Sequence, residues 1–524
     1  MTTSCRRRLH ATLITLALGQ AGCTTLSPQA QTATLITRAE AAMGSASLNT
    51  LTVTGRGTGA SVGQAHAPGQ AWPGLRLGAL SRSLNFETAS FREEFIRSRS
   101  RSEGLGGGTL HPPGGSEARG VVLASDAFAW DVAGIATVAV PSAVAERAHD
   151  LWTTTPPGAI KAAARMGARA GVRRDFLRRW DTLSFELPGR FSATLVLEDT
   201  GLISRIESTV AHALLGEMPV VTEFLEYRLQ AGLMLPSRIV QSQGGFAALD
   251  LQLTAAIANE PVEITVPDNV RTAVPTVDVQ NVADGVWFLG GGTHNSVAIE
   301  TATQIVLIEV PLNDTRARAV LSAASRLVPG KQPLTVINTH HHFDHAGGLR
   351  FAEASGATIL TSALAKPYYE AIFTRHPIAA AGLLTSVGRA SVFVAVEEKA
   401  VLGDAERLIE IHEVKGSLHA RGLLMVWLPR EQLLVTADAF TPGEPRAPDA
   451  PLSAAPVPPV APAVSAVSAV SAAPVVPAVP DPNAANLVQN LERLGLAPKL
   501  ILPLHGRVVT ASELYTQAGR SLPR

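Results

Sequence analysis

The sequence predicts an α/β protein in two parts, a mainly antiparallel β domain at residues 24–272 and an α/β domain at residues 273–524. In the first part, short stretches of alternating polar and apolar residues are separated by glycine and proline, as in paired antiparallel strands. In the second part, apolar strands alternate with helical patterns across short links, which favours an α/β arrangement. A chain of 524 residues is also too long for a single core.

Charge and cysteine content restrict the possible partners and ligands. Lysine plus arginine and aspartate plus glutamate both number 44, so no excess charge is available to attract nucleic acid, and we expect no nucleic-acid partner. The two cysteines, Cys5 and Cys23, both lie near the amino terminus. The folded domains therefore have neither an internal disulfide framework nor a cysteine that could bind a metal.

The first 23 residues have the layout of a secretory signal peptide. Arginines at 6–8 precede a short apolar run at 11–19, and small residues follow up to Cys23. The apolar run is too short to span a bilayer. These features predict that the protein is exported to the periplasm.

The end of this segment, Ala21-Gly22-Cys23, resembles the bacterial lipobox, the cleavage site of lipoprotein signal peptides. The resemblance implies cleavage before Cys23, a lipid on the Cys23 side chain and attachment to the membrane through that anchor. Gln20 stands where lipoproteins usually have leucine, so an exported protein that is cleaved near Ala30 and carries no lipid is the alternative.

Within the β domain, residues 195–206 predict a hairpin that turns at Asp199-Thr200-Gly201, and residues 221–228 predict a further strand. A helical pattern at residues 156–180 interrupts the strands. This segment carries a cluster of arginines, which could bind an anionic partner or could form a solvated helix face. The clustered residues are Arg165, Arg169, Arg173, Arg174, Arg178 and Arg179.

The α/β domain contains an early strand–helix–strand pattern. Residues 305–310 and 334–338 predict strands. Between them, Asp314 is placed to cap a helix that runs to about Leu327.

A segment of unusual composition divides the end of this domain. Residues 442–482 consist largely of Ala, Pro, Val and Ser and show neither helix nor strand period. We expect a disordered or polyproline-like insertion there. A helical pattern at residues 486–494 marks the return of folded chain.

A dense run of potential metal ligands follows the predicted strand at residues 334–338. It spans residues 339–348 and reads Thr-His-His-His-Phe-Asp-His-Ala-Gly-Gly. Such a place, at the carboxyl end of a strand, is where α/β folds commonly hold ligands. Imidazoles and a carboxylate suit zinc or iron, and alternate histidines of an extended segment can converge on one ion. The glycine pair permits close backbone approach where a helix begins.

The run contains the H-x-H-x-D-H signature of the metallo-β-lactamase superfamily, and the chain from Val274 to about Val509 resembles that superfamily. The signature stands at His340, His342, Asp344 and His345. Later ligands of the family are matched in the expected order: His419 after Gly-Ser-Leu, Asp438 at the end of a predicted strand, and His505 within Pro-Leu-His-Gly. The resemblance implies an αββα sandwich for this domain.

The resemblance also implies a centre with two divalent metal ions. His340, His342 and His419 would bind the first ion, Asp344, His345 and His505 would bind the second, and Asp438 would bridge the two. Zinc is the favoured metal, with iron or manganese as alternatives. Two such ions can activate water without a protein nucleophile, and we expect catalysis to depend on Asp344.

Three further features bear on the site. Members of the family often have an aspartate where this chain has Glu309, which leaves the support of the metal ligands open. The sequence around Glu309, together with the histidine run, resembles exported members of the quinoprotein-relay type. His294 and Asn295 follow a glycine-rich turn, and they could contact substrate or could belong to a simple hairpin turn.

These observations together predict a metal-dependent hydrolase that acts on an ester, thioester or amide-like bond of a small molecule. A metal-dependent redox or sulfur-transfer protein on the same fold is one alternative. A non-catalytic binding lipoprotein is another, although the complete ligand set argues against it. The sequence indicates neither the exact substrate nor the oligomeric state.

Overall fold

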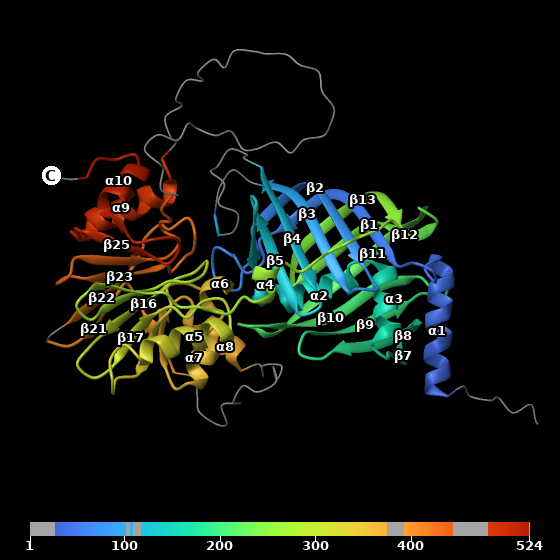
Figure 1. The fold of residues 1–524 in the computed structure, drawn as a ribbon, viewed down its shortest axis with the longest axis horizontal. Coiled ribbons are helices and arrows are strands. Elements are labelled where there is room, and N and C mark those ends of the chain that lie inside the picture. Colours follow the sequence, from blue (N-terminus) through green and yellow to red (C-terminus); the bar gives the residue numbers. More distant parts are fainter. Residues whose placement is uncertain are drawn as a thin grey trace, which may run out of the picture.

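A computed structural model describes residues 27–100, 105–107, 117–174, 177–374, 392–405, 407–443 and 480–522. The predicted signal peptide and all but the ends of the predicted insertion lie outside these residues. The predicted two-part α/β fold is confirmed: a large antiparallel sheet precedes a domain with two sheets and covering helices (Figure 1). In the described part of the chain, no helix has both the length and the apolar character that a membrane span needs.

The amino-terminal sheet has 13 strands in the order β6-β5-β4-β3-β2-β1-β13-β12-β11-β10-β9-β8-β7. The first and last strands of this part pair at its centre, where Leu51 lies opposite Ala258. The strands are β1 (Thr50–Ala60), β2 (Gly74–Asn85), β3 (Ser90–Arg99), β4 (Ala118–Ser125), β5 (Phe128–Ala133), β6 (Ala136–Ala139), β7 (Arg169–Arg174), β8 (Arg179–Leu187), β9 (Phe191–Leu197), β10 (Ile203–His212), β11 (Gly216–Gln230), β12 (Leu233–Gln243) and β13 (Phe246–Ala258).

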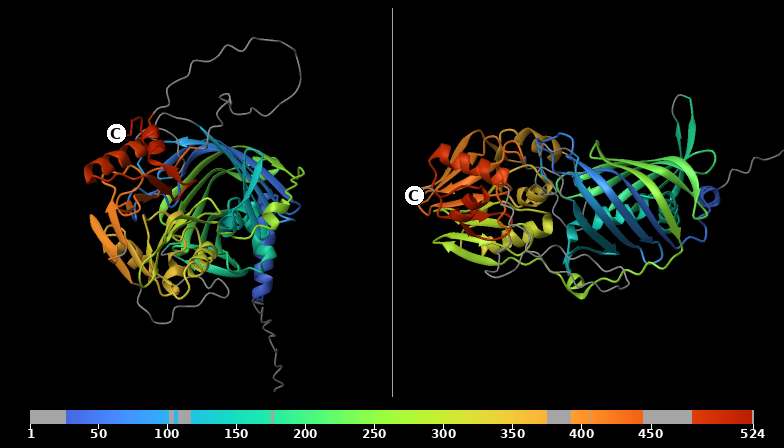
Figure 2. Two further views of the ribbon diagram at one scale, coloured as in Figure 1. Left: turned by 60° about the vertical axis from the view of Figure 1, so that its left-hand side comes forward. Right: turned by 90° about the horizontal axis from the view of Figure 1, so that it is seen from above.

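This sheet is strongly curved, and helices lie against its concave face (Figures 1 and 2). Buried side chains of α2 and α3, such as Trp152 and Ile160, join Leu84 and Ile206 of the sheet in one apolar core. The helical elements of this part are α1 (Pro28–Met43), the short 3-10 helix η1 (Pro141–Ala143), α2 (Val144–Thr153), α3 (Pro156–Arg165) and α4 (Asp268–Arg271).

The predicted hairpin at residues 195–206 is confirmed by β9 and β10, and the predicted strand at 221–228 lies within β11. The predicted helix at 156–180 is wrong beyond Arg165. Gly167 has a φ of 65°, a left-handed conformation that ends the helix, and the following residues form the hairpin β7–β8. Several of its arginines are exposed and pair with acidic side chains, among them Arg173 with Glu207 at 2.5 Å.

The carboxyl-terminal domain stacks two sheets face to face, with helices on both outer sides (Figure 1). The first sheet has β14 (Val279–Ala283), β15 (Val286–Leu289), β16 (Ser296–Glu300), β17 (Ile305–Ile308), β18 (Pro333–Ile337), β19 (Thr358–Ser362) and β20 (Phe393–Val396). The second has β21 (Lys399–Gly403), β22 (Leu408–Glu413), β23 (Leu424–Leu428), β24 (Leu433–Thr436), β25 (Leu500–Pro503) and β26 (Val509–Thr510). The helices are α5 (Asp314–Ser325), α6 (Phe343–Ala346), α7 (Leu349–Ala354), α8 (Lys366–Phe373), α9 (Pro482–Leu494) and α10 (Ala511–Gln517).

The central strand β17 of the first sheet is buried on both faces. In β17, Ile305 and Leu307 belong to the core under the helices, and Val306 and Ile308 belong to the core between the sheets. The helix that follows begins at Asp314, the residue predicted to cap it, so its cap lies one residue earlier than predicted. Asn313, not Asp314, caps it, and Asn313 Oδ1 accepts a hydrogen bond from the Arg316 backbone N–H at 3.0 Å.

Candidate metal centre

The histidine-rich run begins after β18, at the carboxyl end of the parallel strands β17, β18 and β19. Asn338, directly after the strand, is buried, and its amide donates a hydrogen bond to the carbonyl oxygen of His340 at 2.9 Å. Its Oδ1 accepts hydrogen bonds from the hydroxyls of Thr361 and Tyr369, at 3.1 and 2.7 Å. This buried network fixes the turn that leads from the strand into α6.

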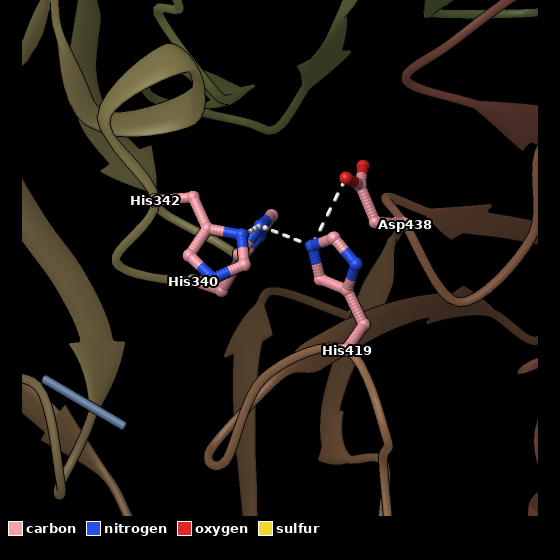
Figure 3. Close-up of side chains that lie close together, drawn as sticks. All are labelled: His340, His342, His419 and Asp438. Carbon is pink, nitrogen blue, oxygen red and sulfur yellow. Dashed lines mark hydrogen bonds and ion pairs between the residues drawn. The ribbon is translucent and has the colours of Figure 1, made fainter. Parts of the chain in front are cut away.

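Four side chains form a first group of potential metal ligands: His340, His342, His419 and Asp438 (Figure 3). Nε2 of His340 lies 3.1 Å from Nδ1 of His342 and 3.2 Å from Nε2 of His419. Oδ2 of Asp438 lies 3.0 Å from Nε2 of His419. The structure thus brings together the three histidines predicted for the first ion and the predicted bridging aspartate.

A second group lies on the other side of Asp438. The Nε2 atoms of His345 and His505 are each 3.0 Å from Oδ1 of Asp438 and 3.1 Å from each other. His294 belongs to this group as well, with its ring centroid 4.9 Å from that of His345 and 4.2 Å from that of His505. The two oxygens of Asp438 therefore face two different sets of histidines.

In His505 and His342, the ring nitrogen that points away from the cluster, here called the outer nitrogen, faces a hydrogen-bond acceptor. Nδ1 of His505 lies 3.0 Å from the carbonyl oxygen of Thr293, and Nε2 of His342 lies 2.8 Å from that of Ala65. A neutral ring then carries its proton on the outer nitrogen and turns the lone pair of the inner nitrogen into the cluster. The inner nitrogens, which face the cluster, lie 3.1–3.2 Å apart. Where two of them both present lone pairs, no hydrogen bond can form between them. They fit metal ions, because tetrahedral ligands about 2.0–2.1 Å from zinc lie about 3.3 Å apart.

Glu309 supplies the support that the sequence left open. It is fully buried and follows β17 with a φ of 61°. One carboxylate oxygen lies 2.7 Å from Nδ1 of His345, and the other accepts a hydrogen bond from the hydroxyl of Thr339. Glu309 therefore orients His345 from behind, the role that an aspartate was expected to have.

Asp344, predicted for the second ion, lies beside that group and makes two other contacts. Its Oδ2 is 3.3 Å from Nε2 of His294, and its Oδ1 accepts a hydrogen bond from the side-chain amide of Gln64 at 2.8 Å. The sequence left His294 between a substrate contact and a simple turn residue. The structure places its ring among the potential ligands.

Asn295, the other residue considered for substrate contact, has a different position. It is buried, and its side-chain amide donates hydrogen bonds to the carbonyl oxygens of Pro503 and Gly506, at 3.2 and 2.9 Å. Both amide hydrogens are therefore used to hold the loop that carries His505. Asn295 thus positions a potential ligand.

The electrostatics of the cluster favour a bound cation. Burial opposes ionisation of Asp438, but the surrounding histidines outweigh it and hold the pKa of this carboxyl well below its ordinary value. Burial and nearby histidines lower the pKa of His340, so its ring is neutral at neutral pH. The ionised Asp438 and the neutral His340 are thus in the protonation states that metal binding requires. The same carboxylate raises the pKa of His345 and His505, so a cation that binds there displaces their protons.

A segment of the amino-terminal part, between β1 and β2, completes the surroundings of the cluster. Besides the bond from Gln64 to Asp344, the carbonyl oxygen of Ala65 lies 2.9 Å from Nε2 of His341 and 2.8 Å from Nε2 of His342. No motif in the sequence marks these residues, so their role could not be predicted from it. A cavity of about 730 Å³ opens onto both groups and is lined from both parts of the chain.

Comparison with known proteins places the same part of the chain in a family. The family model described as the metallo-beta-lactamase superfamily matches residues 289–490. A comparison with curated protein sequences gave no match.

Three solved structures illustrate the likeness. A metallo-beta-lactamase from Pontibacter korlensis is 17% identical, with 47% of this chain and 98% of that chain covered and a TM-score of 0.32. One from Hirschia baltica is 17% identical, with 48% and 99% covered and a TM-score of 0.32. Rubredoxin oxygen:oxidoreductase from the anaerobe Desulfovibrio gigas is also 17% identical, with 46% and 60% covered and a TM-score of 0.32. Together, the ordered ligand set and the matching family model identify the carboxyl-terminal part of the chain as a metallo-beta-lactamase superfamily domain, with a His/Asp cluster that could hold metal.

Proposed function

We propose that this domain is a metal-dependent hydrolase that uses two divalent cations, with zinc favoured, to cleave an ester, thioester or amide-like bond of a small molecule. The observation that carries the proposal is the position of Asp438, with Oδ2 3.0 Å from His419 and Oδ1 3.0 Å from both His345 and His505. A carboxylate in this position is suited to bridge two ions. Such a pair, when bound, lowers the pKa of a water molecule and polarises the substrate oxygen.

The residues of the chain would hold the ions, orient them and limit the access of water. His340, His342 and His419 would hold one ion, and His345 and His505 the other. The side chains of His345 and His419 are 0% and 3% exposed, whereas that of His505 is 21% exposed. Substrate and water would therefore enter on the side of His505. Asp344, whose side chain is 32% exposed, would complete the second set of ligands from the same cavity.

The decisive experiment measures metal content and hydrolysis in the same preparations of the full chain. Metal-stripped protein is reloaded with zinc, iron or manganese and assayed against ester, thioester, lactam and phosphoester substrates. We expect about two metal equivalents and turnover of at least one ester, thioester or lactam. Asp438→Asn should reduce the rate by at least about a hundredfold and release metal, because it removes the negative charge between the two sites.

The matched control is Asp284→Asn, at an exposed aspartate of the same domain, which should keep wild-type metal content and turnover. Full activity of Asp438→Asn would contradict the proposal. So would a metal-loaded protein that hydrolyses none of the substrates, and a redox-active iron centre in that protein would favour the redox alternative.

A further inference from the structure

The cavity at the metal centre extends to the concave side of the amino-terminal sheet. At one end it is lined by Asp344, Asp438 and His505, and at the other by residues of the sheet and of α2. The sheet end contains apolar side chains such as Val210 and Met218 together with a few polar groups. A molecule whose reacting bond lies at the metals could therefore place a second part against the sheet.

Arg97, on β3, lines this cavity without a direct ion-pair partner. In the described part of the chain its guanidinium makes neither an ion pair nor a hydrogen bond, and its Nε is buried without a partner. Its Cζ lies 4.5 Å from the centroid of the Phe95 ring. Burial of a cation is costly unless an anion or acceptors accompany it. The position therefore favours an anionic ligand.

The charges of Glu93 and Asp131 favour the Arg97 cation, but each of these carboxylates pairs directly with another arginine. Glu93 pairs with Arg82, and Asp131 pairs with Arg147, at 2.5 Å in the second case. Glu146 lines the same cavity, but burial and the neighbouring carboxylate of Asp150 raise its pKa to about 7. Near neutral pH a large share of Glu146 is therefore uncharged and does not neutralise the positive charge of Arg97.

His212 adds an oriented hydrogen-bond donor between the two ends of the cavity. Its Nδ1 accepts hydrogen bonds from the backbone N–H groups of Leu214 and Leu215, at 3.2 and 3.1 Å. The proton of the neutral ring is therefore on Nε2, which has no partner among the described residues. The ring packs against that of Phe343, with centroids 4.5 Å apart, and Phe343 directly precedes Asp344 in the chain.

We propose that the substrate of the metal centre carries an anionic arm, a carboxylate or a phosphate, that lies under the amino-terminal sheet and pairs with Arg97, while Nε2–H of His212 donates to an oxygen of the same arm. The identity of the reacting bond rests on the proposed hydrolase function. The anion site does not, because Arg97 and His212 belong to the other part of the chain.

The test compares two esters of equal length on the full metal-loaded chain: the mono-4-nitrophenyl ester of glutaric acid, which ends in a carboxylate, and 4-nitrophenyl valerate, which is neutral. We expect the wild type to have a kcat/KM about ten- to a hundredfold higher for the anionic ester, the factor that a charge-assisted hydrogen bond gives. Arg97→Gln should bring this ratio close to one, mainly through KM, with metal content unchanged. Arg97→Lys should restore part of the ratio.

The matched control is Arg92→Gln, on the same strand, where Arg92 pairs with Glu94 at 2.7 Å and does not line the cavity. It should keep the wild-type ratio. Equal kcat/KM for the two esters in the wild type, or an unchanged ratio in Arg97→Gln, would overturn the anionic arm and leave the hydrolase function intact.

A binding measurement separates the two proposals. Calorimetry on metal-free full chain with butyrate and with propylphosphonate tests the anion site without metals and distinguishes a carboxylate from a phosphonate, the stable analogue of a phosphate. Binding of either anion that Arg97→Gln abolishes supports the site, even if no ester is hydrolysed. Binding of neither anion, or binding that Arg97→Gln leaves unchanged, overturns it.

Discussion

At the scale of single residues, Glu309 illustrates how a buried carboxylate can define a metal ligand. It is 0% exposed, and its two oxygens bind His345 and Thr339. Burial disfavours the charged ring of His345, but the carboxylates of Glu309 and Asp438 outweigh burial and raise the pKa of that histidine. In the absence of a cation, these two carboxylates, Glu309 behind the ring and Asp438 in front of it, thus hold His345 as an imidazolium.

Replacing Glu309 with glutamine should weaken metal binding with little change in shape. The amide cannot accept the His345 proton as strongly as a carboxylate, so the ring loses its fixed orientation. We expect the affinity for the second metal equivalent to fall about ten- to a hundredfold, as for other residues that orient metal ligands. Competition with a chelating dye would measure this.

Glu300→Gln, which alters a carboxylate that pairs with Lys331 away from the cluster, is the control and should keep the wild-type affinity. If both variants bind two equivalents equally well, Glu309 does not support the centre.

The residues that could be predicted from the sequence are those with a local signal. His340, His342, His345, His419, Asp438 and His505 stand in short motifs, and the structure brings them together. Gln64 and Ala65 stand in no motif and reach the cluster only because the chain folds back across about 280 positions. Contacts of this kind follow from tertiary packing, which a local pattern does not encode.

At the scale of elements, the segment between β1 and β2 joins the two parts of the molecule. Gly63 has a φ of 79°, and a Cβ at this position would lie 2.4 Å from the ring of Phe343. Only glycine allows so close an approach of the backbone. The carbonyl oxygen of Ser417 lies 3.1 Å from Nε2 of His66, and the backbone N–H of Arg421 donates to the His66 carbonyl at 2.7 Å.

This arrangement makes Gln64 a positioning residue of the metal centre. Gln64→Ala removes the amide that holds Oδ1 of Asp344, so the carboxylate gains freedom of rotation. We expect kcat to fall about tenfold or more, with KM changed less and the melting temperature within a few degrees of the wild type. Steady-state kinetics on the best substrate of the hydrolase panel, with metal content measured alongside, would check this.

Gln70, exposed in the same segment, provides the matched variant Gln70→Ala, which should behave as the wild type. An equal loss in both variants would mean that the segment acts through general stability and not through Asp344.

The helices and strands that could be predicted are those whose pattern of polar and apolar residues continues without interruption. The hairpin β9–β10 and the strands β17 and β18 follow the alternation or the apolar runs of their sequences. The helix expected to continue to Trp180 ends at Arg165, because a glycine outweighs the helical spacing of the arginines. The order of strands in the large sheet, with β1 beside β13, depends on pairing between residues about 200 positions apart. No local sequence pattern predicts this order.

At the scale of the whole molecule, the two parts share one apolar core. The same cluster of buried residues includes Leu84 and Ile206 of the amino-terminal sheet and Leu307 and Val336 of the carboxyl-terminal domain. Together with the hydrogen bonds of Gln64 and Ala65, this continuity makes independent unfolding of the two parts unfavourable. Metal binding at the centre should therefore stabilise the amino-terminal sheet as well.

The distribution of tryptophans allows a direct measurement of this coupling. Four of the six tryptophans, at positions 72, 130, 152 and 180, lie in the amino-terminal part, and the other two are Trp287 and Trp427. In a Trp287→Phe, Trp427→Phe chain, fluorescence reports only on the amino-terminal part.

Zinc at about a thousand times its dissociation constant should stabilise a coupled molecule by about 4 kcal/mol, which raises the fluorescence midpoint by several degrees. Chelation should reverse the shift, and the same chain with Asp438→Asn should show none. The opposite result is a fluorescence midpoint that zinc does not change, together with a second transition in circular dichroism that zinc does shift. That result would mean that the sheet and the metal centre unfold independently.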